Sequence, residues 1–157
     1  MRYLGGTKER GIVYKYGKSG EVPKLSACSD AEYAGQSKDG KSITGWIVLL
    51  GSAMISAKSK KQPVVALSTA EAEYIALAAV VQEVMYTRNI LKFLGLKVEG
   101  PTPVYVDNRA CKLIAEGETT VRGVKHINVR YHFVKEAVKL REVELFHVRT
   151  DKLPADL

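Results

Sequence analysis

The sequence predicts an α/β domain, in which a mixed sheet of short strands is packed against helices. Three observations support this class. Strand-like segments fill most of the first sixty residues, a long segment with helical periodicity follows at 69–93, and a short apolar run, VYVD, comes after it. The chain has 157 residues, which is the length of one domain with a substantial core.

The first part of the chain is expected to form an antiparallel meander. β-Branched and aromatic residues predict a strand at 11–16, and a second strand is expected at 24–30. The polar run 35–42 is typical of a turn. The apolar segment 44–50 is then expected to pair with 53–59, because a Gly-Ser break separates the two.

The second part of the chain is expected to alternate between helices and strands. The periodic segment 69–93 predicts a long helix, which Gly95 is expected to close. The elements expected after it are a buried strand at 104–107, a short helix at 108–117, a helix at 126–139 and a last strand at 143–148.

Composition and charge limit the possible functions. The content of 46% apolar and 26% charged residues is ordinary for a globular domain, and no apolar run reaches the length of a membrane span. The N-terminus has no apolar core of a secretory signal, so we expect an intracellular protein. The net charge of +7 favours a polyanionic partner, with nucleic acid as the first candidate.

Two aspartates follow strand-like runs. Asp30 ends the predicted strand 24–30, and Asp107 ends the run VYVD. A carboxylate in this position is held by rigid backbone at the edge where α/β sheets bind ligands. The alternative for Asp107 is that it only caps the helix that follows.

Two glutamates lie in the first turns of the long helix. Ser68 and Glu71 have the spacing of a capping box, in which Glu71 reaches back to the amide of the N-cap residue. At about 100° per residue, Glu73 lies about 200° from Glu71, on the side of Leu77, Val80, Val84 and Leu91. Glu73 is therefore predicted to face the sheet, and Glu71 the solvent.

A carboxylate on a buried stripe needs a cation or a basic partner. If the long helix packs on the sheet, Glu73 lies beside Asp30 and Asp107, and three converging carboxylates repel one another unless something cationic neutralises them. Oxygen ligands favour Mg²⁺ or Mn²⁺. Paired ions of this kind suit phosphoryl transfer, so the hypothesis from the residues is metal-dependent cleavage of a nucleic-acid backbone.

Several motifs resemble the ribonuclease H domain of copia-type retrotransposon polyproteins. They occur in the order of that family across nearly the whole chain. The motifs are SDAEYAG (29–35), KSITGWIVLLG (41–51), ISAKSKKQPVVALSTAEAEYIAL (55–77), YVDN (105–108), KHINVRYHFVKE (125–136) and PADL (154–157). Residues 1–11 are similar to the tail of a reverse transcriptase, so we expect 1–157 to be a single ribonuclease H-like domain that begins with this remnant.

The resemblance implies a ribonuclease H-like fold, with a mixed five-stranded sheet of an antiparallel meander plus parallel strands, and with flanking helices. It implies cleavage of the RNA strand of RNA–DNA hybrids with two Mg²⁺ ions, for which Mn²⁺ can substitute. Asp30 would bridge both ions, Glu73 and Asp107 would hold the ion on the leaving-group side, and Asp156 would hold the ion that activates water. The implied partners are the hybrid and the reverse transcriptase domain of the parent polyprotein, in a cytoplasmic particle or the nucleus.

One departure from the family raises a rival hypothesis. Asp156 is the second-to-last residue, whereas the family continues into a final helix, which is expected to be missing here. The rival is a truncated or domesticated copy that binds nucleic acid or a protein partner without cleaving. A similar two-metal nuclease that acts on DNA is a third reading, which the motifs disfavour.

Other residues are candidates for contacts with nucleic acid. The structural alternative is a solvated basic turn for the lysines, and the cap of a helix for Ser68 and Asn108. The candidates are Lys58, Lys60, Lys61, Ser68, Thr69, Asn108 and Arg109.

Overall fold

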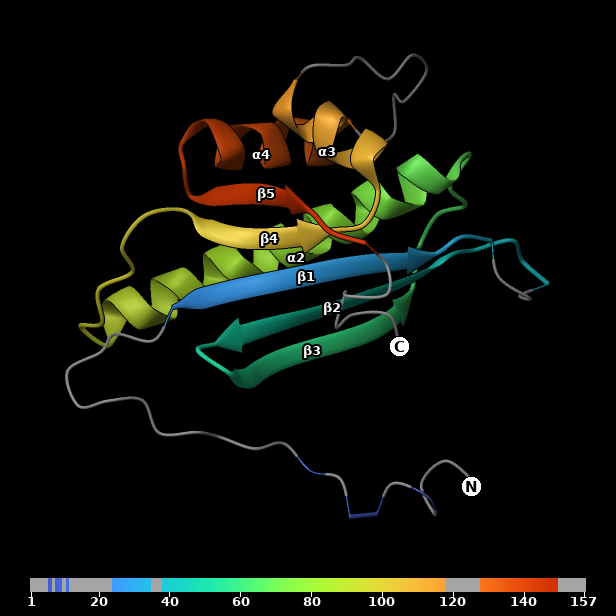
Figure 1. The fold of residues 1–157 in the computed structure, drawn as a ribbon. Helices are drawn as coiled ribbons and strands as arrows, with labels where there is room; N and C mark the ends of the chain where they lie inside the picture. The colour runs from blue at the N-terminus through green and yellow to red at the C-terminus, as the bar shows by residue number, and fades with distance from the viewer. Residues whose placement is uncertain are drawn as a thin grey trace.

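The computed structural model describes residues 24–34, 38–117 and 128–149, together with the isolated residues Gly6, Lys8, Glu9 and Gly11. These residues form one five-stranded sheet and three helices, which Figure 1 shows packed together. The elements in chain order are β1 (Leu25–Glu32), β2 (Ile43–Leu50), β3 (Ala53–Lys61), α2 (Thr69–Phe93), β4 (Thr102–Val106), α3 (Arg109–Glu116), α4 (Asn128–Lys139) and β5 (Val143–His147).

The sheet has the strand order β3-β2-β1-β4-β5. The first three strands form an antiparallel meander, and β4 pairs in parallel with both β1 and β5. The predicted mixed five-stranded sheet is thus confirmed. Most of the strand predicted at 11–16 and the Asp156 segment lie outside the described residues.

One strand boundary differs from the prediction in a way that concerns the site. β1 continues to Glu32, and Asp30 pairs with Gly45 of β2 inside the ladder. The expectation that Asp30 ends its strand was wrong, because β2 is long enough to pair with two further residues of β1. The strand predicted at 104–107 is β4 at Thr102–Val106, so Asp107 directly follows this strand and is not its last residue.

The long helix α2 begins and ends as its sequence predicts. Ser68 is the N-cap, and its side-chain oxygen accepts a hydrogen bond from the Glu71 amide at 3.2 Å. At the other end, the amide of Gly95 donates to Lys92 and that of Leu96 donates to Leu91. Gly95 has φ 76, the left-handed conformation that this C-terminal motif requires.

The core lies between the sheet and the three helices. Alternation along β2 directs Trp46 and Val48 into this core, whereas Ile47 points to the opposite face of the sheet. Residues from all three helices join the same apolar cluster as the strands, so α2, α3 and α4 cover one face. None of the described helices is long and apolar enough to cross a membrane.

Candidate metal centre

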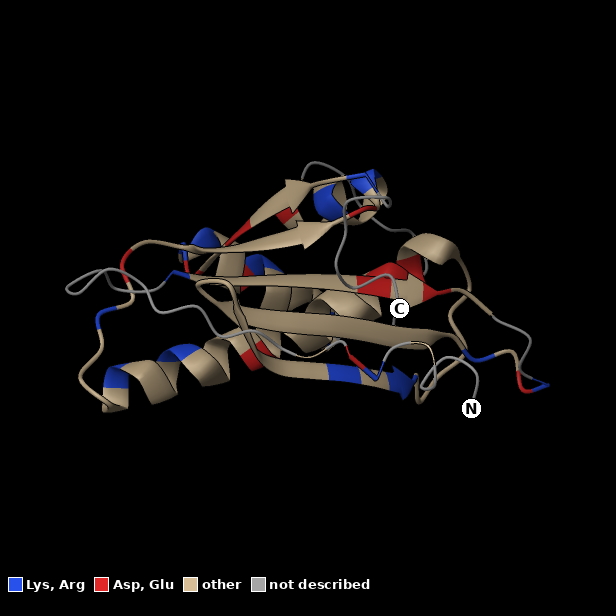
Figure 2. Ribbon diagram, turned by 60° about the horizontal axis from the view of Figure 1, so that its bottom comes forward, with Lys and Arg blue, Asp and Glu red and all other residues tan. Residues whose placement is uncertain are grey.

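Three carboxylates from three elements meet at one end of the sheet. Asp30 belongs to β1, Asp107 follows β4, and Glu73 belongs to the second turn of α2. Single carboxylate oxygens of the three residues all lie within 4.8 Å of one another. In Figure 2, acidic positions accordingly gather beside one end of the central strands.

The pairing of β1 with β4 explains why the two aspartates meet. Ala27 is level with Val104, and Cys28 is level with Tyr105. The same register, extended by two residues, places Asp30 level with Asp107 on the neighbouring parallel strand. Adjacent strands are about 4.8 Å apart, so two residues that are level on neighbouring strands have adjacent side chains.

Helix α2 brings the third carboxylate to the same place. Its apolar stripe packs on the sheet, and Leu77, Val80 and Val84 are fully buried. Glu73 heads this stripe and is only 5% exposed. Glu71 lies on the other side of the helix, with Gln82 and Asn89, both of which are exposed. The prediction that Glu73 faces the sheet and Glu71 the opposite side of the helix is confirmed.

The capping interaction of Glu71 differs by one residue from the prediction. Its Oε2 accepts a hydrogen bond at 2.8 Å from the amide of Leu67, and not from that of Ser68. Glu71 still satisfies a backbone donor at the helix N-terminus, so its role is structural.

Burial and like charge act strongly on Glu73. Desolvation first, and then the charges of Asp107 and Asp30, raise the pKa of Glu73 to about 8, which a hydrogen bond from the Ala31 amide partly offsets. Burial, followed by the charges of Glu73 and Asp107, likewise raises the pKa of the Cys111 thiol. Both shifts show that the site concentrates negative potential in a poorly solvated position.

The groups around the carboxylates fix their orientation. The amide of Ala31 donates to Oδ1 of Asp30 at 2.8 Å. Asn108 is the N-cap of α3, and its side-chain oxygen accepts from the Cys111 amide at 3.0 Å. The alternative in which Asp107 caps this helix is therefore wrong, and the Asp107 side chain is directed instead to the acidic cluster.

Sequence reasoning missed the position of His147. Its Nε2 lies 2.9 Å from the carbonyl oxygen of Asp107, to which it can donate a hydrogen bond. His147 is level with Val106 in the parallel pairing of β4 with β5. The sequence signal for this contact is that His147 ends the last strand, while Asp107 directly follows the preceding strand in the chain.

The remaining candidate residues are separated by the structure. Lys58, Lys60 and Lys61 all line a cleft beside α2, and Lys61 also forms an ion pair with Asp39 at 3.1 Å. Thr69 and Arg109 are the exposed first residues of α2 and α3. Asp156 lies outside the described residues, so its place in the site stays a prediction.

The three carboxylates fit a divalent hard cation. Oxygens bound to one Mg²⁺ at about 2.1 Å lie at most about 4.2 Å apart, so a set within 4.8 Å needs only a small contraction. The donors are all carboxylate oxygens, the type of ligand that Mg²⁺ and Mn²⁺ prefer. A bound cation would also remove the repulsion that raises the pKa of Glu73.

Comparison with known proteins finds homologues over nearly the whole chain. No protein-family model matches the chain. The chain is 36% identical over 156 residues to the retrovirus-related Pol polyprotein from transposon RE2 of Arabidopsis thaliana. It is 34% identical over 157 residues to the corresponding polyprotein from transposon TNT 1-94 of Nicotiana tabacum. The matches include 99% and 100% of this chain, which spans only 10% and 11% of the two polyproteins.

The solved structures show the fold. A type 1 ribonuclease H, LC11, was solved in complex with an RNA/DNA hybrid, and it superposes with a TM-score of 0.61 at 14% identity. The match covers 85% of this chain and 91% of that enzyme. The chain is therefore a homologue of one segment of the retrovirus-related Pol polyproteins of transposons, and its fold is that of ribonuclease H domains.

Proposed function

We propose that this chain is a ribonuclease H, which hydrolyses the RNA strand of RNA–DNA hybrids. The observation that supports this most is the convergence of Asp30, Glu73 and Asp107 from three separate elements. Three carboxylates held this closely, one of them buried, destabilise the fold unless they serve to bind cations. Homology to Pol polyproteins and a neighbour solved with a hybrid favour this substrate.

In this proposal two Mg²⁺ ions are held by Asp30, Glu73, Asp107 and Asp156. When bound, the ions supply an activated water and stabilise the charge on the attacking and leaving oxygens. The chain itself presents the carboxylates in a fixed arrangement, because β1, β4 and α2 are packed in one core. Glu73 must lose its proton to become a ligand, so cation binding releases a proton.

The relatives support a proposal for the setting of the activity. The chain corresponds to about a tenth of each Pol polyprotein. We propose that it acts next to a reverse transcriptase domain and removes template RNA after copying, in a cytoplasmic particle or the nucleus. The rival function is binding of nucleic acid or of a protein without cleavage.

Cleavage of a labelled RNA–DNA hybrid in the presence of Mg²⁺ tests the proposal. We expect the chain to cleave the RNA strand, Asp30→Asn to abolish cleavage, and Asp39→Asn to leave it unchanged. Asp39 is a suitable control because it is a surface aspartate paired with Lys61. A folded chain that binds the hybrid without cleaving it would favour the rival, and cleavage by Asp30→Asn would refute the site.

A further inference from the structure

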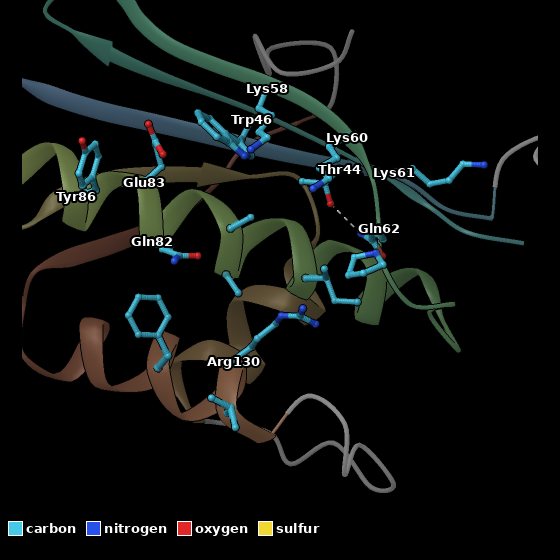
Figure 3. A pocket seen from close by; sticks show the side chains of 16 residues that line it. Thr44, Trp46, Lys58, Lys60, Lys61, Gln62, Gln82, Glu83, Tyr86 and Arg130 are labelled. Atoms are coloured by element: carbon cyan, nitrogen blue, oxygen red, sulfur yellow. Dashed lines mark hydrogen bonds between the residues drawn. The ribbon is translucent and has the colours of Figure 1, made fainter.

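A cleft separate from the acidic cluster runs along α2. Its floor is α2, one wall is the edge strand β3, and the other wall is the first half of α4 (Figure 3). Its volume is about 700 Å³, which is within the range of ligand sites. We call it the β3–α4 cleft.

Cations face each other across this cleft. Lys58 lies opposite Trp46 and Lys60 lies opposite Thr44 in the pairing of β3 with β2, so both lysines are on the sheet face that α2 covers. Arg130 lines the cleft from α4, and Figure 3 shows its side chain extending toward α2. Positive charge from two distant segments of the chain therefore converges here.

These three cations have no acidic partner among the described residues. Other described lysines do have such a partner within 4 Å: Lys61 pairs with Asp39, and Lys112 pairs with Glu116. Glu83 is the one carboxylate among the residues that line the cleft, and it accepts a hydrogen bond from Ser56 at 2.8 Å. The cleft therefore has an excess of positive charge that a polyanion can neutralise.

Aromatic side chains accompany the cations. Tyr86, which is 62% exposed, lies at one end of the cleft, and Trp46 and Phe133 also line it. A positively charged groove with aromatic side chains is the combination that binds single-stranded nucleic acid, in which phosphates meet the cations and bases stack on the rings. An acidic peptide would use the cations and leave the aromatic side chains without a partner.

Gln62 connects the cleft to the acidic cluster. It lines the cleft, is 2% exposed, and its Nε2 donates to Thr44 and to the carbonyl oxygen of Ala72, the neighbour of Glu73. Its Oε1 is buried and accepts no hydrogen bond from the described residues. A donor on a bound strand, such as a base amino group or a ribose hydroxyl, would satisfy this oxygen after a small adjustment.

Lysines on an edge strand also discourage pairing with a second sheet. That role explains Lys58 and Lys60, but it does not explain Arg130, which is on a helix. It also does not explain the exposed Tyr86 at one end of the cleft. The combination of cations, aromatic rings and an unsatisfied amide oxygen favours a ligand.

We propose that the β3–α4 cleft binds one single-stranded segment of nucleic acid. Its phosphates contact Lys58, Lys60 and Arg130, and a base stacks on Tyr86. This inference goes beyond the proposed cleavage, because binding here needs neither a metal nor the acidic cluster. The first α2 residue that lines the cleft is Ile75, which lies about 200° around the helix from Glu73, so the cleft is a site separate from the acidic cluster.

Fluorescence anisotropy with a labelled single-stranded oligonucleotide, in EDTA and at several salt concentrations, tests the charge component. The triple variant Lys58→Gln/Lys60→Gln/Arg130→Gln is compared with a control of equal charge, Lys92→Gln/Lys97→Gln/Lys139→Gln, whose three lysines are exposed and outside the cleft. Each phosphate contact contributes about −0.7 to the slope of log affinity against log salt. We expect the cleft variant to lose about 2 from that slope and the control to lose little.

A second pair of variants tests the stacking component. We expect Tyr86→Ala to weaken binding by about tenfold, since stacking on an aromatic side chain contributes substantially to single-strand affinity, and Tyr86→Phe to retain it. Phe93→Ala is the control, because Phe93 is an exposed aromatic residue on the same helix outside the cleft.

Three results would overturn the proposal. The first is an equal loss of affinity in the two triple variants, and the second is the absence of binding at low salt. The third is that a polyglutamate peptide displaces the labelled oligonucleotide at a lower concentration than unlabelled oligonucleotide does. The last result would identify an acidic protein partner. If the triple variant does not fold, Lys58→Gln and Arg130→Gln are measured singly. Because EDTA prevents cleavage, failure of the proposed nuclease activity leaves these outcomes readable.

Discussion

Glu71 and Glu73 show how two identical residues in one helical turn acquire different roles. The Glu71 carboxylate accepts a backbone hydrogen bond at the start of α2, whereas Glu73 is buried beside two aspartates. The spacing of two residues determines this difference, because it rotates one side chain to the far side of the helix. Removal of the charge is therefore expected to affect cleavage at Glu73 and the stability of the helix at Glu71.

We predict that Glu73→Gln abolishes hybrid cleavage and leaves the fold intact, because it removes a proposed cation ligand. Glu71→Gln removes the same charge two residues away and is expected to cost less than about 1 kcal/mol of stability, with cleavage retained. Cleavage assays and urea unfolding of both variants provide the measurement. Loss of activity in Glu71→Gln but not in Glu73→Gln would contradict the site.

The raised pKa of Glu73 predicts a dependence of stability on pH. Its pKa is about 8 in the folded protein and about 4.5 in the unfolded chain. Between these values the folded state binds the extra proton, so the unfolding free energy of the metal-free protein falls as pH rises from about 4.5 to about 8. The contribution is on the order of a few kcal/mol.

Urea unfolding in EDTA from pH 5 to 9 measures this contribution as the difference between wild type and Glu73→Gln. We expect the variant to be the more stable protein at pH 8 and above, and Mg²⁺ to restore stability to the wild type there. Parallel pH profiles of the two proteins would show that Glu73 is not the group that titrates.

At the scale of elements, buried polar contacts fix how the helix meets the strands at the end of the sheet opposite the acidic cluster. Arg88 of α2 is 5% exposed and donates to Gly100 and to Thr102 of β4. Its Nε lies 2.8 Å from Oε2 of Glu142, which precedes β5. These two atoms do not have hydrogen-bond geometry, so the contact is chiefly ionic. Arg88 thereby joins α2, β4 and β5.

We predict that Arg88→Met destabilises the protein by about 3 kcal/mol. The substitution leaves the Glu142 carboxylate without its ionic partner, and it removes the hydrogen bonds that Arg88 donates to the Gly100 carbonyl and the Thr102 hydroxyl. Lys112→Met is the control, since its pair with Glu116 is a half-buried i,i+4 contact within one helix, a type of pair worth about 0.5 kcal/mol. The additional change Glu142→Gln is expected to recover part of the loss. Similar unfolding midpoints for the two single variants would contradict the importance of this network.

At the scale of the whole molecule, the acidic cluster depends on a single strand pairing. β1 and β4 are far apart in the chain, yet they are parallel neighbours, and this register brings Asp30 level with Asp107. The three helices then cover one face of the sheet, and α2 brings Glu73 to the same end. The proposed fourth ligand, Asp156, comes from the last residues of the chain.

We predict that Asp156→Asn lowers hybrid cleavage on the order of 100-fold, the scale on which one charge-stabilising group acts. The stabilisation of the fold by Mg²⁺ should largely remain, because the other three proposed ligands are unchanged. Asp151→Asn removes an equal charge five residues earlier and should leave cleavage unchanged. Cleavage by Asp156→Asn at the wild-type rate would exclude Asp156 as a ligand.

Local sequence patterns determined a large part of this protein. Helical periodicity determines the bounds 69–93 of the long helix and the separation of Glu71 from Glu73. Capping chemistry determines its start at Ser68 and its end at Gly95. The five strands follow from apolar runs between turns, although the length of β1 did not, because the partner strand β2 sets where its ladder ends.

Tertiary structure alone decided which of these residues meet. The pairing of β1 with β4 in one register is a non-local contact, and so are the hydrogen bond of His147 to Asp107 and the approach of Arg130 to the cleft of Lys58 and Lys60. A local pattern states which side of an element a residue occupies, but not which distant element packs there. That choice is made by the burial of one common core, to which β1, β2, β4, β5 and the three helices contribute.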